Sequence, residues 1–499
     1  MNAHIRFLSA TVAVLVLSVS TTLAQDWPEI YDPLVLRTLN LQMSDADWQT
    51  VQHDETFDIW VPTTLWLDGE APILVAIRRK SADALTNDPD YLKVSYKIDI
   101  NEYVSGQNWH GLRAISLDNG DDENVVSEGL AWYLHRIASG PEGYGYDAGL
   151  ASWVRLIING VDTGVYVSAE QRDKRFLQNR GLWIADETWL YEVEDASGPP
   201  EMDEGGPDDS PLLQSLCYSP FASPSLCPTP DPATLAAALP PVIDMQGLLS
   251  LAAVDAFSAN PDAIFSHGKN FYFVDYLAGQ PRLYLPWDLD SALSGGGVNH
   301  DVYAPQSEYS QVLLGVPEFR AQYSQILNDL VCGPFREANL HAFLNALEPV
   351  LSEALASDPN SQLGHESVAD FFAARRAWFS ARLQAVSSQI EGFVPCDPTA
   401  DVGIVPSDEQ QELQILRVVQ SDNTTEIYYT TGLARHGVRL TIFDVSGRRV
   451  RTFELGEPHG NMVSWDRRDG SGRVVSRGVY FADLRTESAR ASKKFAITR

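Results

Sequence analysis

Two aspartates at the end of an apolar segment are the residues whose type and spacing point most clearly to chemistry. Segment 283–290 reads Leu-Tyr-Leu-Pro-Trp-Asp-Leu-Asp, a strand that leaves the core and ends on two carboxylates. Alternate strand residues share a face, so Asp288 and Asp290 are expected to point together. Paired carboxylates hold protons tightly unless a cation neutralises them, and hard oxygen ligands suit Mg²⁺ or Ca²⁺. The alternative is that both aspartates cap a turn or accept bonds from backbone amides.

A second polar group lies just upstream, in segment 260–273, which reads Asn-Pro-Asp-Ala-Ile-Phe-Ser-His-Gly-Lys-Asn-Phe-Tyr-Phe. Apolar residues continue right up to its polar side chains, among them Asp262 and Asn270. Together with segment 283–290 it is the strongest candidate for a functional cluster in the chain.

Basic side chains lie along two predicted strands. Arg78 and Lys80 share one face of the strand 73–80, and Lys93 and Lys97 point together on the next strand. In an acidic chain, cations lined up on adjacent strands could hold an anion such as a nucleotide phosphate. The alternative is that they pair with surrounding carboxylates. Glu170 is a candidate partner for one of these lysines.

The elements that would position these groups are predicted from hydrophobic periodicity. Residues 26–180 indicate a mixture of helices and strands, ending in a hairpin with an Asn-Gly turn before Glu170. The expected elements are strands 73–77 and 94–100, a helix over 123–137, and hairpin strands 153–158 and 164–169. A helix and a strand follow in 242–275, and amphipathic helices in 336–394.

The remaining segments differ in composition. Residues 195–241 are rich in Pro, Gly, Ser and Asp, which favours a flexible insertion. Residues 396–412 are polar and are expected to form a linker. Residues 413–499 indicate short strands separated by turns, which predicts a small β-sandwich. The expected domains are therefore 25–395 and 413–499.

Charge excludes one class of partner. The 499 residues include 36 Lys and Arg against 67 Asp and Glu, giving a net charge of −31. A chain this acidic repels a polyphosphate backbone, so nucleic acid is not expected as a partner.

The N-terminus predicts export. Arg6 precedes an apolar run over 7–17 and small residues up to Ala24, the pattern of a signal peptide spanning 1–24. We expect an extracellular, cell-surface or periplasmic location and no transmembrane segment. Four cysteines then favour the disulfides Cys217–Cys227 and Cys332–Cys396, although the spacing leaves the other two pairings open.

The motifs together resemble the spore coat protein H family, known as CotH kinases, over about residues 35–390. The stretches that carry the resemblance are Val-Ala-Ile-Arg-Arg-Lys at 75–80, Lys-Ile-Asp-Ile-Asn-Glu-Tyr at 97–103, Leu-Asp-Asn-Gly at 117–120, Asn-Gly-Val-Asp-Thr-Gly-Val-Tyr at 159–166, Glu-Gln-Arg-Asp-Lys-Arg-Phe at 170–176, and residues 260–290. The resemblance implies an α+β fold with a two-lobed, atypical protein-kinase-like domain. It also implies transfer of phosphate from ATP, with Mg²⁺ or Mn²⁺, to Ser or Thr of a protein substrate.

The resemblance also implies residue roles. Asp262 would be the catalytic aspartate that orients the acceptor hydroxyl, and Asp288 the aspartate that holds the metal, with Asp290 and Asn270 as further ligands. Lys80 or Lys97 would bind the phosphates, with Arg78 nearby. Glu170 would be the ion-pair partner of that lysine. Phosphoryl transfer needs positioning and charge neutralisation more than covalent help, so this assignment is physically coherent.

The C-terminal segment resembles the immunoglobulin-like domain of the flagellar hook-capping protein. The resemblance rests on Val-Arg-Leu-Thr-Ile-Phe-Asp-Val-Ser-Gly-Arg at 438–448, with Trp465 and Tyr480 as core anchors. The resemblance implies a C-terminal secretion or attachment module of the kind found in some bacteria, through which the protein could attach to a cell surface. The sequence thus predicts an exported kinase acting on a surface or envelope protein. The alternative is a non-catalytic, kinase-shaped protein of the cell surface or coat.

Overall fold

The structure is a computed structural model of the whole chain. The residues it describes are 29–88, 91–120, 124–139, 146–180, 182–195, 198–216, 221, 231–277, 280–294, 297–358, 360–361, 363, 367–396, 414–420, 424–430, 438–444, 448–455, 462–470, 472–485 and 490–497. The predicted signal peptide 1–24 and the Cys217–Cys227 pair lie outside these ranges, as does all of the predicted linker except Cys396.

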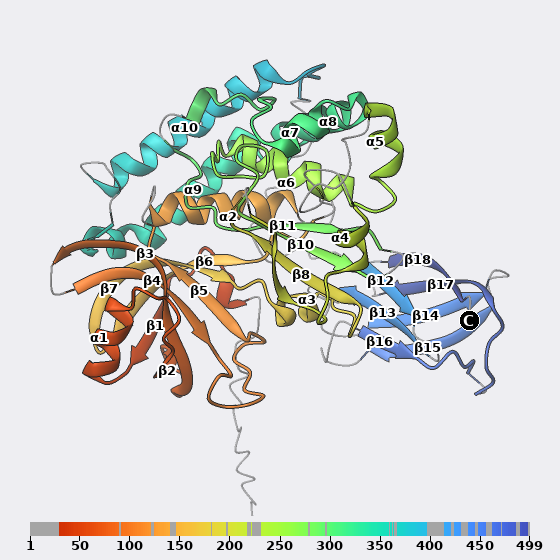
Figure 1. The fold of residues 1–499 in the computed structure, drawn as a ribbon, viewed down its shortest axis with the longest axis horizontal. Helices are drawn as coiled ribbons and strands as arrows, with labels where there is room; N and C mark the ends of the chain where they lie inside the picture. The colour runs from red at the N-terminus through yellow and green to blue at the C-terminus, as the bar shows by residue number, and fades with distance from the viewer. Residues whose placement is uncertain are drawn as a thin grey trace, which may run out of the picture.

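The N-terminal part is a closed seven-stranded barrel in the order β1-β2-β3-β4-β5-β7-β6 (Figure 1). Its strands are β1 (Arg37–Gln42), β2 (Val61–Leu67), β3 (Ile73–Asp88), β4 (Tyr91–Asp99), β5 (Ala114–Asp118), β6 (Ala151–Ile158) and β7 (Val161–Glu170). The parallel pairing of β1 with β6 closes the barrel, and all other neighbours are antiparallel.

Period-two alternation explains how the barrel strands orient their side chains. Val75 and Ile77 of β3 and Val94, Tyr96 and Ile98 of β4 fill the barrel interior, while the residues between them face outward. The predicted hairpin β6–β7 is confirmed. Its turn residues Asn159 and Gly160 both have positive φ, 52° and 79°, as the type of turn that favours Asn-Gly requires.

A second core joins helices to a small sheet. Helix α2 (Val125–Ala138), the predicted helix of the N-terminal half, packs on β6 and β7 of the barrel and on α6. The sheet has the order β11-β10-β8-β9. These elements are β8 (Thr188–Val193), β9 (Glu201–Glu204), α6 (Met245–Phe257), β10 (Phe271–Tyr276), β11 (Leu283–Pro286), α7 (Glu308–Leu314), α8 (Pro317–Cys332), α9 (Glu337–Ser357) and α10 (Val368–Gln389). Figure 1 shows the long helices on the side of α2 that faces away from the barrel.

Shorter elements complete the domain: η1 (Glu29–Tyr31), α1 (Asp45–His53), α3 (Lys174–Asn179) and η2 (Gly297–Asn299). The predicted disulfide Cys332–Cys396 is present, with Cα atoms 5.0 Å apart. None of the helices in the described ranges combines the length and the apolar character that crossing a membrane would require.

Two predictions of local structure need correction. The segment 195–241 is not loop throughout, since its described part contains β9, α4 (Pro211–Ser215) and α5 (Pro232–Ala238). Both helices begin with a polar cap followed by proline, Ser210-Pro211 and Asp231-Pro232, which is a favourable helix start. The strand before the aspartate pair also ends early, at Pro286, so strand alternation does not set the direction of Asp288.

The C-terminal part is all-β, as predicted, with its own core. It comprises a three-stranded sheet, β12-β13-β16, and a four-stranded sheet, β15-β14-β17-β18. Their bounds are β12 (Gln414–Gln420), β13 (Thr425–Thr430), β14 (Val438–Asp444), β15 (Arg449–Leu455), β16 (Met462–Trp465), β17 (Gly478–Arg485) and β18 (Arg490–Ile497). Trp465 and Tyr480 are buried, with ring centroids 5.8 Å apart, as expected of core anchors.

Candidate active site

An ion pair between two barrel strands marks the centre of the site. Lys80 of β3 and Asp118, the last residue of β5, are separated by strand β4, and the lysine Nζ lies 2.6 Å from the Asp118 Oδ1. Both side chains are largely buried, with exposed fractions of 22% and 13%. The Lys80 ammonium also lies 5.1 Å from the centre of the Trp287 ring. The outward face of the barrel therefore meets the segment of the predicted aspartate pair.

Carboxylates from three separate elements act on Lys80. Burial alone would lower the pKa of this lysine, but Asp118, Asp288 and Glu128 together raise it well above its usual value. Glu128 comes from helix α2 and Asp288 from the segment after β11. The fold thus places one ammonium group in the field of three acidic groups that lie far apart in the sequence.

Glu128 is the most buried of these acids, with 2% of its surface exposed. Burial raises its pKa well above the usual range, and Asp118, Asp290 and Asp288 raise it further against the opposing effect of Lys80. Its Oε1 accepts a bond of 3.4 Å from the Trp132 indole, whereas its Oε2 has no hydrogen-bond partner. The Glu128 carboxylate could therefore accept a proton or contact a cation.

Asp288 lies in an unusual backbone conformation. Its φ is +52°, a left-handed value that costs energy for a residue other than glycine, and Asn270 opposite it has φ of +60°. The Asn270 side-chain amide donates to the Asp288 carbonyl at 3.4 Å. Burial raises the pKa of Asp288, with Lys80 opposing this effect and Asp118 adding to it. The neighbours Trp287 and Leu289 are buried, so Asp288 and Asp290 are the polar side chains of this segment.

Asp262 is held ionised by basic neighbours. Its Oδ1 lies 2.7 Å from the His267 Nδ1 and its Oδ2 lies 3.2 Å from the Lys269 Nζ. Ser291, the residue after Asp290, donates to Asp262 Oδ2 at 3.3 Å. Burial would raise the pKa of Asp262, but His267 and Lys269 outweigh it and hold that pKa below its usual value. The hydroxyl of Ser291 therefore ties the Asp262 loop to the segment of the aspartate pair.

Lys97 and Arg78 lie beside one another on the same outward face. They are register partners of β4 and β3. Burial, Arg78 and Lys80 lower the pKa of Lys97, while Asp203 and Glu192 partly oppose them. The Arg78 guanidinium donates to the carbonyl oxygens of Phe57 and Arg79. The three cations Arg78, Lys80 and Lys97 thus share one face, as the sequence predicts, and of these Lys80 is the one on which Asp288 acts.

Two residues of the predicted pattern have other partners. Glu170 forms an ion pair of 2.7 Å with Arg180, which also binds Asp147, and no described lysine pairs with Glu170. Lys93 is fully buried and lies 2.8 Å from Asp358. The lysine partner expected at Glu170 is therefore replaced by an arginine, and Lys93 follows the alternative of a structural ion pair.

Asp118 and Glu128 are the site residues that sequence reasoning missed. Asp118 lies within the Leu-Asp-Asn-Gly motif, where it reads as the end of a strand. Glu128 lies within a helix whose apolar stripe gives no reason to bury a carboxylate. The sequence did place a charged residue, Glu128, among the apolar positions of that helix. Because charged residues are rarely buried without a partner, this position could have indicated a functional or paired carboxylate.

The donor set is compatible with a hard divalent cation. Asp118, Glu128, Asp288 and Asp290 supply carboxylate oxygens, the ligands that Mg²⁺ prefers, and the unpartnered Glu128 Oε2 is buried among them. Among the described residues no group of three or more ligands is already arranged around one point. These residue types suit a divalent metal ion, but their carboxylates would have to move closer together to bind one ion.

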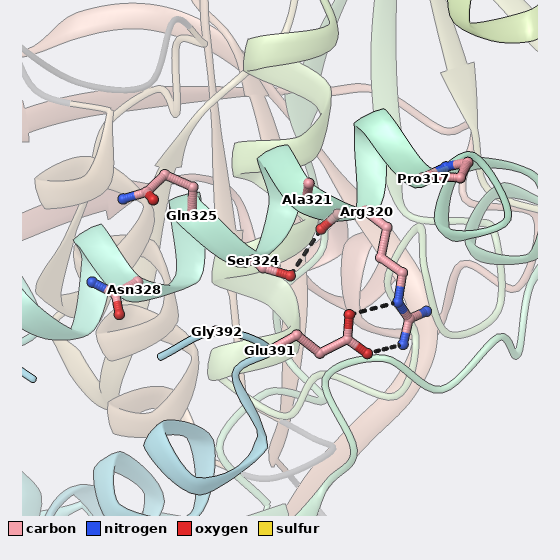
Figure 2. A pocket seen from close by; sticks show the side chains of 8 residues that line it. All are labelled: Pro317, Arg320, Ala321, Ser324, Gln325, Asn328, Glu391 and Gly392. Atoms are coloured by element: carbon pink, nitrogen blue, oxygen red, sulfur yellow. Dashed lines mark hydrogen bonds and ion pairs between the residues drawn. The ribbon is translucent and has the colours of Figure 1, made fainter. Parts of the chain in front are cut away.

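A cavity of about 360 Å³ lies elsewhere, along α8 and the segment that follows α10 (Figure 2). Arg320 and Glu391 form a two-bond ion pair on its wall, with N–O distances of 2.9 and 2.6 Å. The nearby amide of Asn328 accepts a bond from the Val394 backbone. These polar groups are satisfied within the protein, and none belongs to the cluster around Lys80.

Comparison with known families matches residues 88–395 to the family described as CotH kinase protein. The matched range contains every residue of the site except Arg78 and Lys80, which precede it. Among curated proteins, none matches the chain. Because the match covers more than half of the sequence, the chain belongs to the CotH kinase protein family.

Proposed function

We propose that this protein is an ATP-dependent phosphotransferase that phosphorylates Ser or Thr residues of a protein. The observation that carries the proposal is the position of Lys80, 2.6 Å from Asp118 and 5.1 Å from the centre of the Trp287 ring beside Asp288, in a chain of the CotH kinase family. Phosphoryl transfer depends on positioning and on neutralising negative charge, and a buried lysine among carboxylates and a metal can do both.

Lys80 is the proposed phosphate-binding lysine, with Asp118 as its ion-pair partner in place of Glu170. Lys80 lies in the field of Asp288, whereas Lys97 lies nearer Asp203 and Glu192. Glu128 acts on Lys80 from helix α2, while Glu170 is occupied by Arg180. Arg78 and Lys97 would add positive charge to the same face.

Asp262 is the proposed group that orients the acceptor hydroxyl. In the reaction the hydroxyl oxygen forms a bond to the γ-phosphorus, the bond from that phosphorus to the bridging oxygen breaks, and ADP leaves. The hydroxyl proton passes to the Asp262 carboxylate. The lowered pKa of Asp262 makes it a weak base, which suits a loose transition state in which the oxygen needs alignment more than deprotonation.

Asp288 and Asp290 would hold Mg²⁺ or Mn²⁺, with Asn270 as a further candidate ligand. Such an ion would neutralise the phosphate charge. The Asn270 side-chain amide donates to the Asp288 carbonyl at 3.4 Å, and this proximity supports placing both residues in one site.

The layout of the domain supports the kinase-like assignment. The barrel and the helical part have separate hydrophobic cores, and Lys80 and Asp118 come from the first while Glu128, Asp288 and Asp262 belong to elements of the second. A two-lobed kinase is likewise expected to draw its active-site residues from both lobes.

The signal peptide predicted at residues 1–24 supports action on a surface or envelope protein after export. The separate all-β part supports attachment through an immunoglobulin-like domain.

Transfer of label from γ-labelled ATP to a Ser- and Thr-containing protein acceptor, with Mg²⁺ or Mn²⁺, tests the proposal. We expect transfer by the native protein and a loss of roughly 10²-fold or more in Asp262→Asn and Asp288→Asn, as for other electrostatic groups in active sites. Asp329→Asn, on α8 and away from the site, is the matched control. Transfer that is absent, or that survives both site substitutions, would reject the assignment.

The alternative is a non-catalytic protein of the surface or coat. It is favoured by one observation: Lys80 and Asp262 are both engaged by groups of the protein itself, Asp118 on one side and His267 with Lys269 on the other. Titration calorimetry with ATP and Mg²⁺ separates the two. The alternative predicts no heat of binding, and the kinase requires a saturable signal that is lost in Lys80→Met.

A further inference from the structure

Helix α10 makes a set of contacts that the proposed reaction does not itself explain. Three side chains on one stripe of the helix, at positions i, i+3 and i+7, donate to backbone carbonyl oxygens of two segments, the chain that follows Asp290 and the C-terminal end of α6. They are Arg375, Trp378 and Arg382. Residues with this spacing share one helix face, so the stripe is a single surface.

One of the two targets is the chain that follows the aspartate pair. Arg375 donates to the Leu293 carbonyl, and the Trp378 indole donates to the Ser294 carbonyl at 3.2 Å. Arg382 extends the contact to the Val298 and His300 carbonyls, both at 2.8 Å. Leu293 has φ of +60°, so this strained segment is held by bonds from α10.

The other target is the end of α6, from which the Asp262 loop starts. Arg382, which is fully buried, donates to the Ala256 carbonyl at 2.7 Å and to the Phe257 carbonyl at 3.0 Å. Both aspartate-bearing segments are therefore fastened to the same helix face.

Arg375 differs from its two neighbours because it also reaches helix α2. Its second guanidinium nitrogen donates to the Ser127 hydroxyl at 2.9 Å, and Ser127 is the residue before Glu128. Ser127 is itself fixed, since its backbone N–H donates to Asn124 at 2.8 Å. The Arg375 guanidinium thus bridges the first turn of α2, which carries Glu128, and Leu293, three residues after Asp290.

We propose that Arg375 is a positioning residue that couples the register of helix α2, and with it Glu128, to the segment carrying Asp288 and Asp290. The fork of a guanidinium can satisfy two acceptors in fixed geometry, which a lysine ammonium cannot do in the same way. The catalytic part of this inference rests on the proposed function; the coupling part does not.

Hydrogen exchange of the full chain tests the coupling. In Arg375→Met we expect amide exchange to rise together in residues 125–130 and 291–294, by roughly tenfold, because one cross-link holds both. In Ser127→Ala exchange should rise in 125–130 alone. Arg376→Met is the matched control: this neighbouring arginine pairs with Glu348 on α9 and should leave both segments unchanged. If Arg375→Met leaves amide exchange unchanged in either segment, the inference is overturned, whether or not the protein transfers phosphate.

Phosphotransfer kinetics then separate positioning from simple stabilisation. Arg375→Lys keeps the positive charge and most of the packing, so it should recover the Tm that Arg375→Met loses. Its kcat should still fall by roughly 10- to 100-fold, the scale of a misplaced catalytic group, with KM for ATP changed by less than about threefold. Recovery of kcat in parallel with Tm would assign Arg375 a merely structural role. If the native protein transfers no phosphate, the proposed function fails and the exchange result decides the coupling alone.

Discussion

Lys80 and Asp118 form a 2.6 Å ion pair that spans strand β4 on the outward face of the barrel. The pair fixes the lysine beneath the Trp287 ring and within reach of the Asp288 and Glu128 charges. A nucleotide phosphate would share this ammonium with Asp118, which makes Lys80 the most informative residue to change.

Substitution of Lys80 by Met should reduce phosphotransfer by roughly 10²- to 10³-fold, because the developing charge loses its fixed cation. It should also leave the carboxyl groups of Asp288 and Glu128, whose pKa values are raised, without a compensating cation as they ionise, so that Tm falls more at pH 8 than at pH 5. Activity assays and thermal melts at the two pH values measure both effects. Lys174→Met, whose ammonium lies 4.7 Å from the Trp183 ring, serves as the control and should retain activity. Full activity in Lys80→Met would refute its role.

Glu128→Gln should stabilise the protein above neutral pH while it impairs transfer. Burial and the neighbouring acids raise the pKa of Glu128, so the folded state binds its proton more tightly than the unfolded chain does. Stability is therefore lost as pH rises, and the neutral amide avoids that loss. Thermal melts of both proteins from pH 4 to pH 9 should diverge with increasing pH. Curves that stay parallel would show that Glu128 is ionised without cost.

Asp173 gives a second pH test away from the charged cluster. It caps helix α3, accepting a bond of 2.8 Å from the Phe176 backbone N–H, and burial raises its pKa to about 6. The folded state therefore loses stability as pH rises from about 4 to 6, by on the order of 1–3 kcal/mol. Asp173→Asn retains a good cap and should be more stable than the native protein at pH 7.5 but not at pH 3.5. Denaturant titrations at both pH values measure the difference, and a pH-independent effect would contradict the prediction.

The buried pair Lys93–Asp358 should be a strong structural link between β4 and the end of α9. Asp358 also accepts bonds from the backbone N–H groups of Val165 and Asn360, at 2.9 and 2.8 Å. Lys93→Met leaves a buried, unpaired carboxylate, which should cost about 3–5 kcal/mol of unfolding free energy.

Replacing both partners of this pair, in Lys93→Met with Asp358→Asn, should cost less than Lys93→Met alone. Urea titrations of the single and double variants measure this coupling. Additive losses would show that the pair contributes no specific interaction.

Local structure followed from the sequence wherever one pattern dominated. Alternation placed Val75 and Ile77 on one face of their strand, which the structure shows to be the interior of a barrel that the sequence did not predict, and the Asn159-Gly160 turn predicted the β6–β7 hairpin. The helices hidden in segment 195–241 were missed because its overall composition outweighed two short start signals, Ser210-Pro211 and Asp231-Pro232.

The site was harder to predict because its members meet only through tertiary packing. The local pattern singled out Asp288 and Asp290, and strand pairing placed Arg78 beside Lys97. No local pattern could show that Lys80 bridges to Asp118 across a whole strand, or that α2 brings Glu128 toward both. Glu170 was the nearest acid along the chain after the hairpin, but Arg180, the residue directly after α3, forms an ion pair with its carboxylate.

A crystal structure with Mn²⁺ and a non-hydrolysable ATP analogue, with anomalous scattering used to locate the metal, would test the assigned phosphotransfer site most directly. We expect an anomalous peak bound by Asp288, with the γ-phosphate contacted by Lys80 and within reach of Asp262. A nucleotide bound elsewhere, or a metal peak remote from Asp288, would contradict this assignment.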